Sequence, residues 1–276
     1  MFDQFARSWE LAKASAEVLR SDKELLLFPL ISGTATLVVL ATFMIPVFAL
    51  RIFDSGFGIG SALVGFAFYF CQYSVIIFFN CALVGAAMIR LDGGDPTLRD
   101  GLDVARSRLP AILGYAAIAA TVGVLLQSLK SRDNFLVRLL GSGLGVAWTL
   151  ATFLVVPVLV SRDIGPIDAL KQSGALLKRT WGENAIGNVG IGAAFGLITF
   201  AAVAFGVLLT FVAAQASIAL AVLVGVLCAG GVLLLGVYQA ALTAIYSAVL
   251  YRYAQTHETP AAFKGGLLEV AFQPKA

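Results

Sequence analysis

The sequence predicts an all-α fold: a polytopic membrane helix bundle of six transmembrane helices, arranged as three repeats of an interfacial amphipathic helix plus a transmembrane hairpin. Composition is the first observation, because 59% of the 276 residues are hydrophobic, only 13% are charged, and the mean hydropathy is +0.91. Soluble domains carry about 25% charged residues. A chain with half that supply cannot cover a water-facing surface of this size, so most of its surface is expected to face lipid.

Six long apolar segments are the second observation. A helix that crosses roughly 30 Å of hydrocarbon needs about 20 apolar residues. The interiors of these segments contain no Asp, Glu, Lys, Arg or His. The last one would extend about 51 Å as an α-helix, so it must tilt, kink near Gly230–Gly231 or project from the membrane. Residues 1–276 are expected to form a single integral membrane domain with spans at about 25–50, 59–89, 109–126, 139–160, 185–212 and 218–251.

The distribution of Lys and Arg predicts the orientation. Fifteen of the 19 Lys and Arg residues precede span one, follow span six, or lie in the loops after spans two and four. Loops rich in these residues tend to stay in the cytoplasm. We therefore expect both termini to be cytoplasmic, with residues 1–24 as an amphipathic helix and residues 252–276 as a tail.

Short stretches with helical spacing precede spans one, three and five, and these are the third observation. Their apolar residues recur three or four positions apart, which places them on one helix face, and their basic residues occupy the opposite face. Helices of this kind lie in the membrane interface with basic groups near lipid phosphates. The stripes are Phe5, Trp9, Ala12, Ala16 and Leu19, then Leu98, Leu102, Ala105 and Leu109, then Ile167, Leu170, Leu177 and Trp181.

Charged residues in these stretches form a candidate cytoplasmic interface. The run from Arg20 to Glu24 has two interpretations: solvated charges at the membrane edge, or a recognition patch. A further amphipathic stretch begins at Thr259–Pro260. We expect anionic lipid head groups to be partners of the cytoplasmic face. The candidate residues are Asp22, Lys23, Glu24, Arg99, Arg106, Lys178 and Arg179.

Uncharged polar residues inside the spans form a candidate intramembrane polar face. Such groups either bond across helices, at about 1 kcal/mol each, or line a substrate cavity, and the sequence leaves both open. The residues are Tyr69, Gln72, Tyr73, Asn80, Asn188, Gln239, Thr243 and Tyr246.

The sequence offers no catalytic, cofactor-binding or metal-binding constellation. The cysteines Cys71, Cys81 and Cys228 lie in apolar runs, and His257 is the only histidine, so zinc, haem and iron–sulfur sites lack ligands. The spans supply no acid, base or histidine to activate a nucleophile. Acidic residues between 92 and 103 suit either a cation or, more simply, a turn and helix cap. A net charge of +3 gives no indication of nucleic-acid binding.

Two stretches resemble a known family. Leu19–Pro29 (LRSDKELLLFP), with Trp9 before it, and Tyr246–Tyr253 (YSAVLYRY) resemble an uncharacterised family of prokaryotic six-span integral membrane proteins, over nearly the whole chain. The resemblance implies a multi-pass protein of the prokaryotic cytoplasmic (inner) membrane. More distantly, the chain resembles the membrane domains attached to glycerophosphodiester phosphodiesterases, whose catalytic domain this sequence lacks.

Three functions remain open at this point. The first is a non-catalytic membrane scaffold or accessory subunit, with a protein partner or a homo-oligomer. The second is a channel or facilitator for a small or lipid-like solute, which the polar faces of spans two and six favour. The third, least supported, is a membrane-embedded lipid-modifying enzyme, because no catalytic group is apparent.

Overall fold

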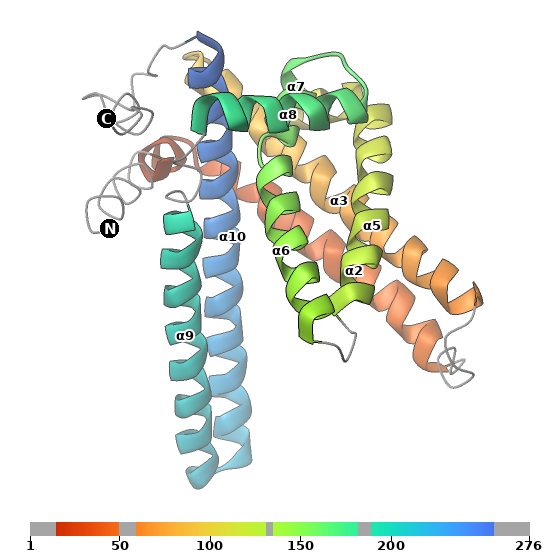
Figure 1. Ribbon diagram of the computed structural model, residues 1–276. Helices are drawn as coiled ribbons and strands as arrows, with labels where there is room; N and C mark the ends of the chain where they lie inside the picture. The colour runs from red at the N-terminus through yellow and green to blue at the C-terminus, as the bar shows by residue number, and fades with distance from the viewer. Residues whose placement is uncertain (1–14, 50–58, 131–134, 182–188, 257–276) are drawn as a thin grey trace, which may run out of the picture.

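The structure is a computed structural model that describes residues 15–49, 59–130, 135–181 and 189–256. Within these ranges the chain is helical and contains no strand, and six segments are long and apolar enough to cross a membrane, as predicted (Figure 1). The polar stretch before residue 15, the residue Asn188 and the tail from residue 257 lie outside the described residues. The elements are η1 (Lys23–Leu26), α2 (Leu27–Ala49), α3 (Ile59–Leu91), α4 (Leu98–Ser107), α5 (Leu109–Lys130), α6 (Phe135–Thr152), α7 (Val155–Ser161), α8 (Pro166–Trp181), α9 (Val189–Ala216) and α10 (Ile218–Thr256).

The buried core lies toward one end of the bundle. There η1, α4, α7, α8 and the last turns of α3 and α10 meet, and we call this the basic end. Contacts across it join segments far apart in sequence: Arg252 pairs with Asp92, and Arg108 pairs with Asp163 at 2.6 Å. The apolar cluster beneath it includes Leu25, Phe28, Leu83, Ile112, Leu159 and Ile245. Among the described residues, the segments with most of the Lys and Arg residues therefore share one side of the bundle.

The stretch Leu19–Pro29, which we call the N-terminal motif, connects the first span to α4. Asp22 ends the helical stretch that begins at residue 15 and caps η1, because its Oδ1 accepts a hydrogen bond from the N–H of Glu24 at 3.1 Å. The Glu24 carboxylate accepts a hydrogen bond from the N–H of Leu98, at the start of α4. A carboxylate is favourable there, since the first N–H groups of a helix lack intrahelical partners.

Helix α4 lies close against α3 and begins with a capping box. The Thr97 hydroxyl accepts from the N–H of Asp100, and both the hydroxyl and the N–H of Thr97 donate to the Asp100 carboxylate, at 2.7 and 2.9 Å. These bonds satisfy first-turn donors and lower the pKa of Asp100. Close approach to α3 is possible because α4 has no side chain at Gly101, whose Cβ would meet the carbonyl oxygen of Ala82 at 2.6 Å.

The fourth span is interrupted, which the hydropathy pattern did not indicate. Helix α6 ends at Thr152 and α7 begins at Val155, with Phe153 and Leu154 in a turn between them. Pro157 has no N–H to donate to the carbonyl of Phe153, so the helical ladder is weakened at this point. Helix α8 supplies hydrogen-bond partners for the backbone at this turn. The buried Ser173 hydroxyl donates to the carbonyl of Ala151 at 2.6 Å and accepts from the N–H of Leu154 at 3.1 Å.

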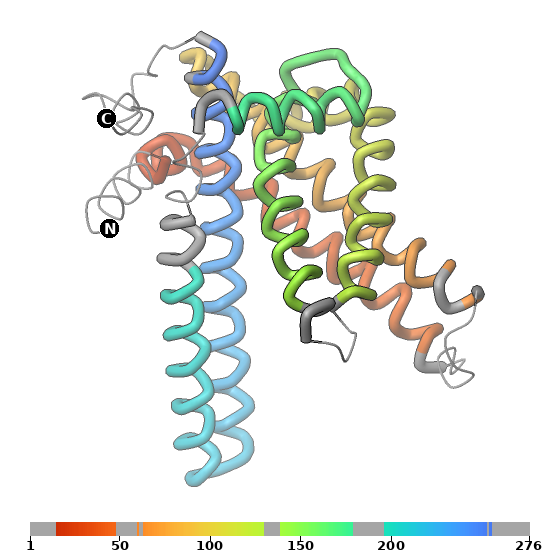
Figure 2. The backbone as a smooth tube through the Cα atoms, viewed as in Figure 1, coloured from red at the N-terminus to blue at the C-terminus, as the bar shows by residue number. Residues whose placement is uncertain are grey.

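Helices α9 and α10 form a hairpin that stands partly apart from the other spans (Figure 2). Their contact is close at Gly206, where an added Cβ would lie 3.1 Å from the Cβ of Cys228. Small residues allow such approach between membrane helices. Helix α10 runs unbroken through Gly230–Gly231, so its length of about 58 Å is accommodated without a break at these glycines. Only its C-terminal half enters the buried core.

Helices α4 and α8 precede the hairpins α5–α6 and α9–α10, where short helices were predicted. They pack differently: α4 lies along α3, whereas α8 contacts α6, α7 and α5. The equivalence of the three units stays a prediction.

Candidate lateral pocket between α3, α7 and α10

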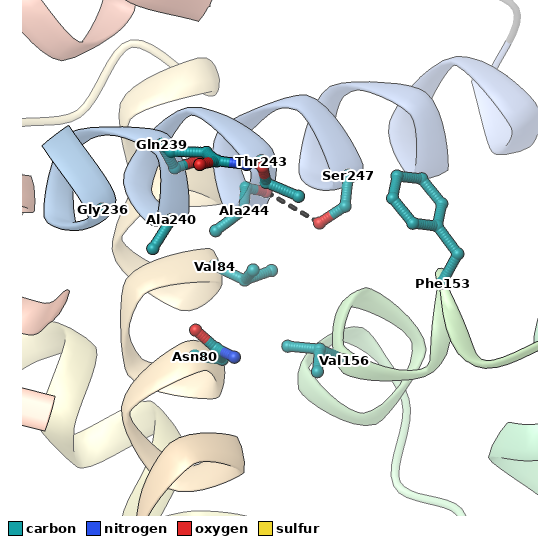
Figure 3. A pocket seen from close by; sticks show the side chains of 10 residues that line it. All are labelled: Asn80, Val84, Phe153, Val156, Gly236, Gln239, Ala240, Thr243, Ala244 and Ser247. Carbon is teal, nitrogen blue, oxygen red and sulfur yellow. Dashed lines mark hydrogen bonds between the residues drawn. The ribbon is translucent and has the colours of Figure 1, made fainter. Parts of the chain in front are cut away.

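A pocket of about 360 Å³ lies where α10 passes the break between α6 and α7 (Figure 3). We call it the lateral pocket. Helix α10 forms one wall, α3 a second, and the α6–α7 turn with α7 a third. Its volume falls at the lower end of the range of about 300–1,000 Å³ that is typical of ligand pockets. The lining residues are Asn80, Val84, Phe153, Val156, Gly236, Gln239, Ala240, Thr243, Ala244 and Ser247.

The pocket has an open side and a closed end. On α10, Gly236, Ala240 and Thr243 are exposed, while Ala244 and Ser247, farther toward the basic end, are buried. Val84 on α3 is also buried. The exposed residues belong to a helix that is long and apolar enough to cross a membrane, so in a bilayer the open side would face lipid.

Two side-chain amides, from Asn80 and Gln239, line the pocket from different helices. Neither side-chain amide forms a hydrogen bond with any other residue in the described part of the chain. Both side chains are half-buried. An amide removed from water without a partner costs several kcal/mol, roughly 2–7 depending on the reference state. These amides can therefore offer donors and acceptors to a molecule in the pocket.

The two hydroxyls of the lining are already engaged as donors. Thr243 donates to the carbonyl of Gln239 at 2.9 Å, and Ser247 donates to the carbonyl of Ala244 at 2.8 Å. Each oxygen retains acceptor capacity. The pocket thus has polar groups of both kinds, and none of its lining residues is ionisable.

Three contacts link the pocket's walls at the basic end. Arg252 of α10 pairs with Asp92 just after α3, and Arg162 just after α7 donates to the side-chain carbonyl of Gln255 at 3.1 Å. Ser161 donates to the sulfur of Met88 at 3.2 Å. Together these contacts tie α3, α7 and α10 beyond the closed end of the pocket.

The structure places three members of the predicted intramembrane polar face, Asn80, Gln239 and Thr243, around this pocket. Tyr73 lies elsewhere, toward α5, where its hydroxyl would be 3.1 Å from a Cβ on Gly123. The ring centroid of Tyr69 is 6.2 Å from that of Tyr73, and the Gln72 side-chain carbonyl is buried with no described hydrogen-bond partner.

Tyr246 is buried, with its ring centroid 6.3 Å from that of Phe153. Ser247, Phe153 and Val156 also line the pocket and were not predicted from the sequence. Ser247 follows Gln239 and Thr243 at intervals of four positions, and this spacing was the available signal. Nothing in the sequence indicates that Phe153 and Val156 face the same space, because they do so only through the break in the fourth span.

The candidate cytoplasmic interface is divided in the structure. Asp22 is 8% exposed and acts within the chain as the cap of η1, and Glu24 binds the start of α4. Lys23 and Lys178 are exposed, whereas the side chain of Arg179 lies outside the described residues. Arg99 and Arg106 are exposed and both pair with Asp103, at 3.7 and 3.1 Å.

The described residues contain no cluster of potential metal ligands. No group of three or more His, Cys, Asp or Glu residues is placed to hold a metal ion there. Cys71, Cys81 and Cys228 are free thiols.

Comparison with known proteins adds the family. A search of curated proteins finds no match to this sequence. A family model described as a family of unknown function, DUF6159, matches residues 59–261, which include every lining residue of the lateral pocket. This chain belongs to the DUF6159 family, and it has membrane-like helices.

Proposed function

We propose that this protein is a non-catalytic membrane protein that binds a lipid-like solute in the lateral pocket and serves as a facilitator for it. The observation that carries the proposal is the pair of amides, Asn80 and Gln239, that line a pocket without a hydrogen-bond partner in the described chain. If the Asn80 and Gln239 amides served only to join helices, they would be expected to hydrogen-bond to groups on the neighbouring helices. A bound molecule with its own polar group would satisfy them.

The depth of the open side supports entry from the bilayer. Thr243 and Gly236 precede Arg252 by nine and sixteen residues, so they lie about 14 and 24 Å from it along α10. Charged side chains are costly in hydrocarbon and favour the interface. If Arg252 lies at the membrane interface, the open side of the pocket reaches the middle of a hydrocarbon layer about 30 Å thick.

The proposal includes the orientation and the lipid partners. The basic end would face the cytoplasm, in the inner membrane of a prokaryote, because Lys and Arg gather on that side of the chain. The exposed side chains Lys23 and Lys178 would lie near anionic head groups. Lipid binding at the basic end is separate from occupation of the lateral pocket.

The substitution Ala240→Phe tests the proposal. Ala240 is exposed at the open side of the pocket, so a phenyl ring there fills the entrance without displacing buried atoms. Native mass spectrometry of the protein released from lipid nanodiscs should show a retained lipid-like molecule on the wild type and its loss from the variant. Ala219→Phe, at an exposed position near the other end of α10, is the control and should retain it. Equal retention by all three proteins would refute the proposal.

A second candidate function, a scaffold or accessory subunit, is favoured by the α9–α10 hairpin. Helix α9 packs mainly on α10 within the described chain, and the hairpin exposes large side chains such as Phe200, Phe205 and Leu227. Lipid covers such a surface equally well, so the observation is weaker than the pocket. Native mass spectrometry in mild detergent should then detect a homo-oligomer or a partner in fixed stoichiometry, and a protein found only as a monomer would contradict it.

A further inference from the structure

The lateral pocket restricts the charge of what it can bind. Its polar lining consists of two carboxamides and two hydroxyls, from Asn80, Gln239, Thr243 and Ser247. None of these can neutralise a phosphate or an ammonium group. Moving an uncompensated ion into such surroundings costs several kcal/mol even after relaxation. The site therefore disfavours the head groups of common phospholipids.

The position of the open side restricts where the ligand comes from. Gly236, Ala240 and Thr243 are exposed at a depth near the middle of the hydrocarbon layer, whereas the closed end at Ser247 lies about 8 Å from Arg252 along α10. Phospholipid head groups stay at the interface because they are charged. A long-chain molecule whose polar part is small and uncharged can reach the bilayer centre at much lower cost.

The amides supply the recognition. Each carboxamide has two N–H donors and one carbonyl acceptor, and neither Asn80 nor Gln239 uses them on another described residue. Ligand hydroxyl and ester carbonyl groups complement such a pair. With about 360 Å³, the pocket would hold a small polar group and the adjoining carbons, while the chains remain in the bilayer.

We infer that the lateral pocket takes the uncharged head of a long-chain neutral lipid, such as a diacylglycerol, which enters from the bilayer centre and hydrogen-bonds to Asn80 and Gln239. This inference rests on the proposed function and specifies its ligand class.

Photo-crosslinking in phosphatidylcholine nanodiscs tests it. The probe is a diacylglycerol with a diazirine on one acyl chain, close to the ester carbonyl, so that it lies with the head in the pocket. The readout is the yield of crosslinked peptides that contain Asn80 or Gln239, measured by mass spectrometry. Unlabelled diacylglycerol in excess should compete, and phosphatidic acid with the same acyl chains should not. Equal competition by phosphatidic acid would overturn the ligand class while leaving a lipid site in place. Crosslinking that neither unlabelled lipid reduces, even in excess, would overturn the proposed function itself.

The amides are tested by Asn80→Leu and Gln239→Leu. Each change removes hydrogen bonds in a low-dielectric site, so each should weaken competition by diacylglycerol about tenfold. Gln127→Leu, an exposed glutamine in α5 outside the pocket, is the matched control and should leave competition unchanged. Unchanged competition by both pocket variants would refute the role of the amides. If a variant fails to fold, the competition experiment on the wild type still decides the ligand class.

Discussion

The ring of Phe28 in α2 packs directly against Gly101 in α4. A Cβ at Gly101 would lie 2.5 Å from the Cζ of Phe28 and 2.6 Å from the carbonyl oxygen of Ala82 in α3. Phe28 itself is almost completely buried. Three elements of different parts of the sequence therefore meet at one glycine, and the N-terminal motif is held to the rest of the bundle there.

Gly101→Ala should destabilise the protein by about 1–3 kcal/mol, because the backbone of Ala82 cannot move aside as a flexible side chain can. Thermal unfolding in detergent measures the effect. Gly174→Ala in α8 is the matched control, since no atom lies within 4 Å of its added Cβ, and helix propensity there favours alanine by up to about 1 kcal/mol. Similar melting temperatures for the two variants would contradict the close packing at Gly101.

Ser173→Ala should loosen the turn between α6 and α7. The change leaves the carbonyl of Ala151 and the N–H of Leu154 without their side-chain partner in a buried site, at a cost of about 1–3 kcal/mol. Ser74→Ala removes a hydroxyl that bonds only within α3, to the carbonyl of Phe70, and should cost less. Hydrogen exchange of the Leu154 amide gives a local readout, and exchange that stays as slow as in the wild type would argue against this role.

Asp92→Asn should have a small, salt-dependent effect. The pair with Arg252 joins α10 to α3, but Asp92 is 61% exposed, so the pair contributes about 0–1 kcal/mol. The difference in melting temperature between variant and wild type should shrink as ionic strength rises. A large loss that persists in high salt would show that the pair is less accessible to solvent than the structure indicates.

The capping box of α4 predicts a pH dependence. Hydrogen bonds from Thr97 lower the pKa of Asp100 in the folded protein. The contribution is therefore complete above the unfolded pKa of about 3.9 and is lost as the pH falls through the lower folded value. Asp100→Ala should melt below the wild type at neutral pH, and the two curves should converge in acid. A Thr97→Ala background removes the hydroxyl bond to Asp100 but keeps the bond from the backbone N–H, so the pH-dependent difference should shrink there. A difference of unchanged size would refute the role of the Thr97 hydroxyl in the cap.

Hydropathy and charge predicted the six spans and the segments that share the basic end, because both depend on local composition. The break at Phe153 and Leu154 was not predictable in the same way. Pro157 signals a weak point in a helix, but the turn is completed by Ser173, nineteen residues after Leu154. Such a tertiary hydrogen bond leaves no pattern in the hydropathy of the span.

The candidate site was predictable in part. Asn80, Gln239 and Thr243 were recognisable as polar residues in apolar spans, and the structure brings them to one pocket. Their grouping depends on which face α10 turns toward α3, and uniformly apolar helices carry little information on that. Asp22 was predicted as an interface residue because it lies in a polar run. In the structure it caps η1 and is buried.

A structure determined in lipid nanodiscs that contain diacylglycerol would show directly what occupies the lateral pocket. We expect an elongated ligand that enters between Gly236 and Thr243, with its polar end within hydrogen-bonding distance of Asn80 and Gln239. A structure in which these two amides bond to each other and α10 closes onto α7, with no space between them, would show that the pocket binds no lipid.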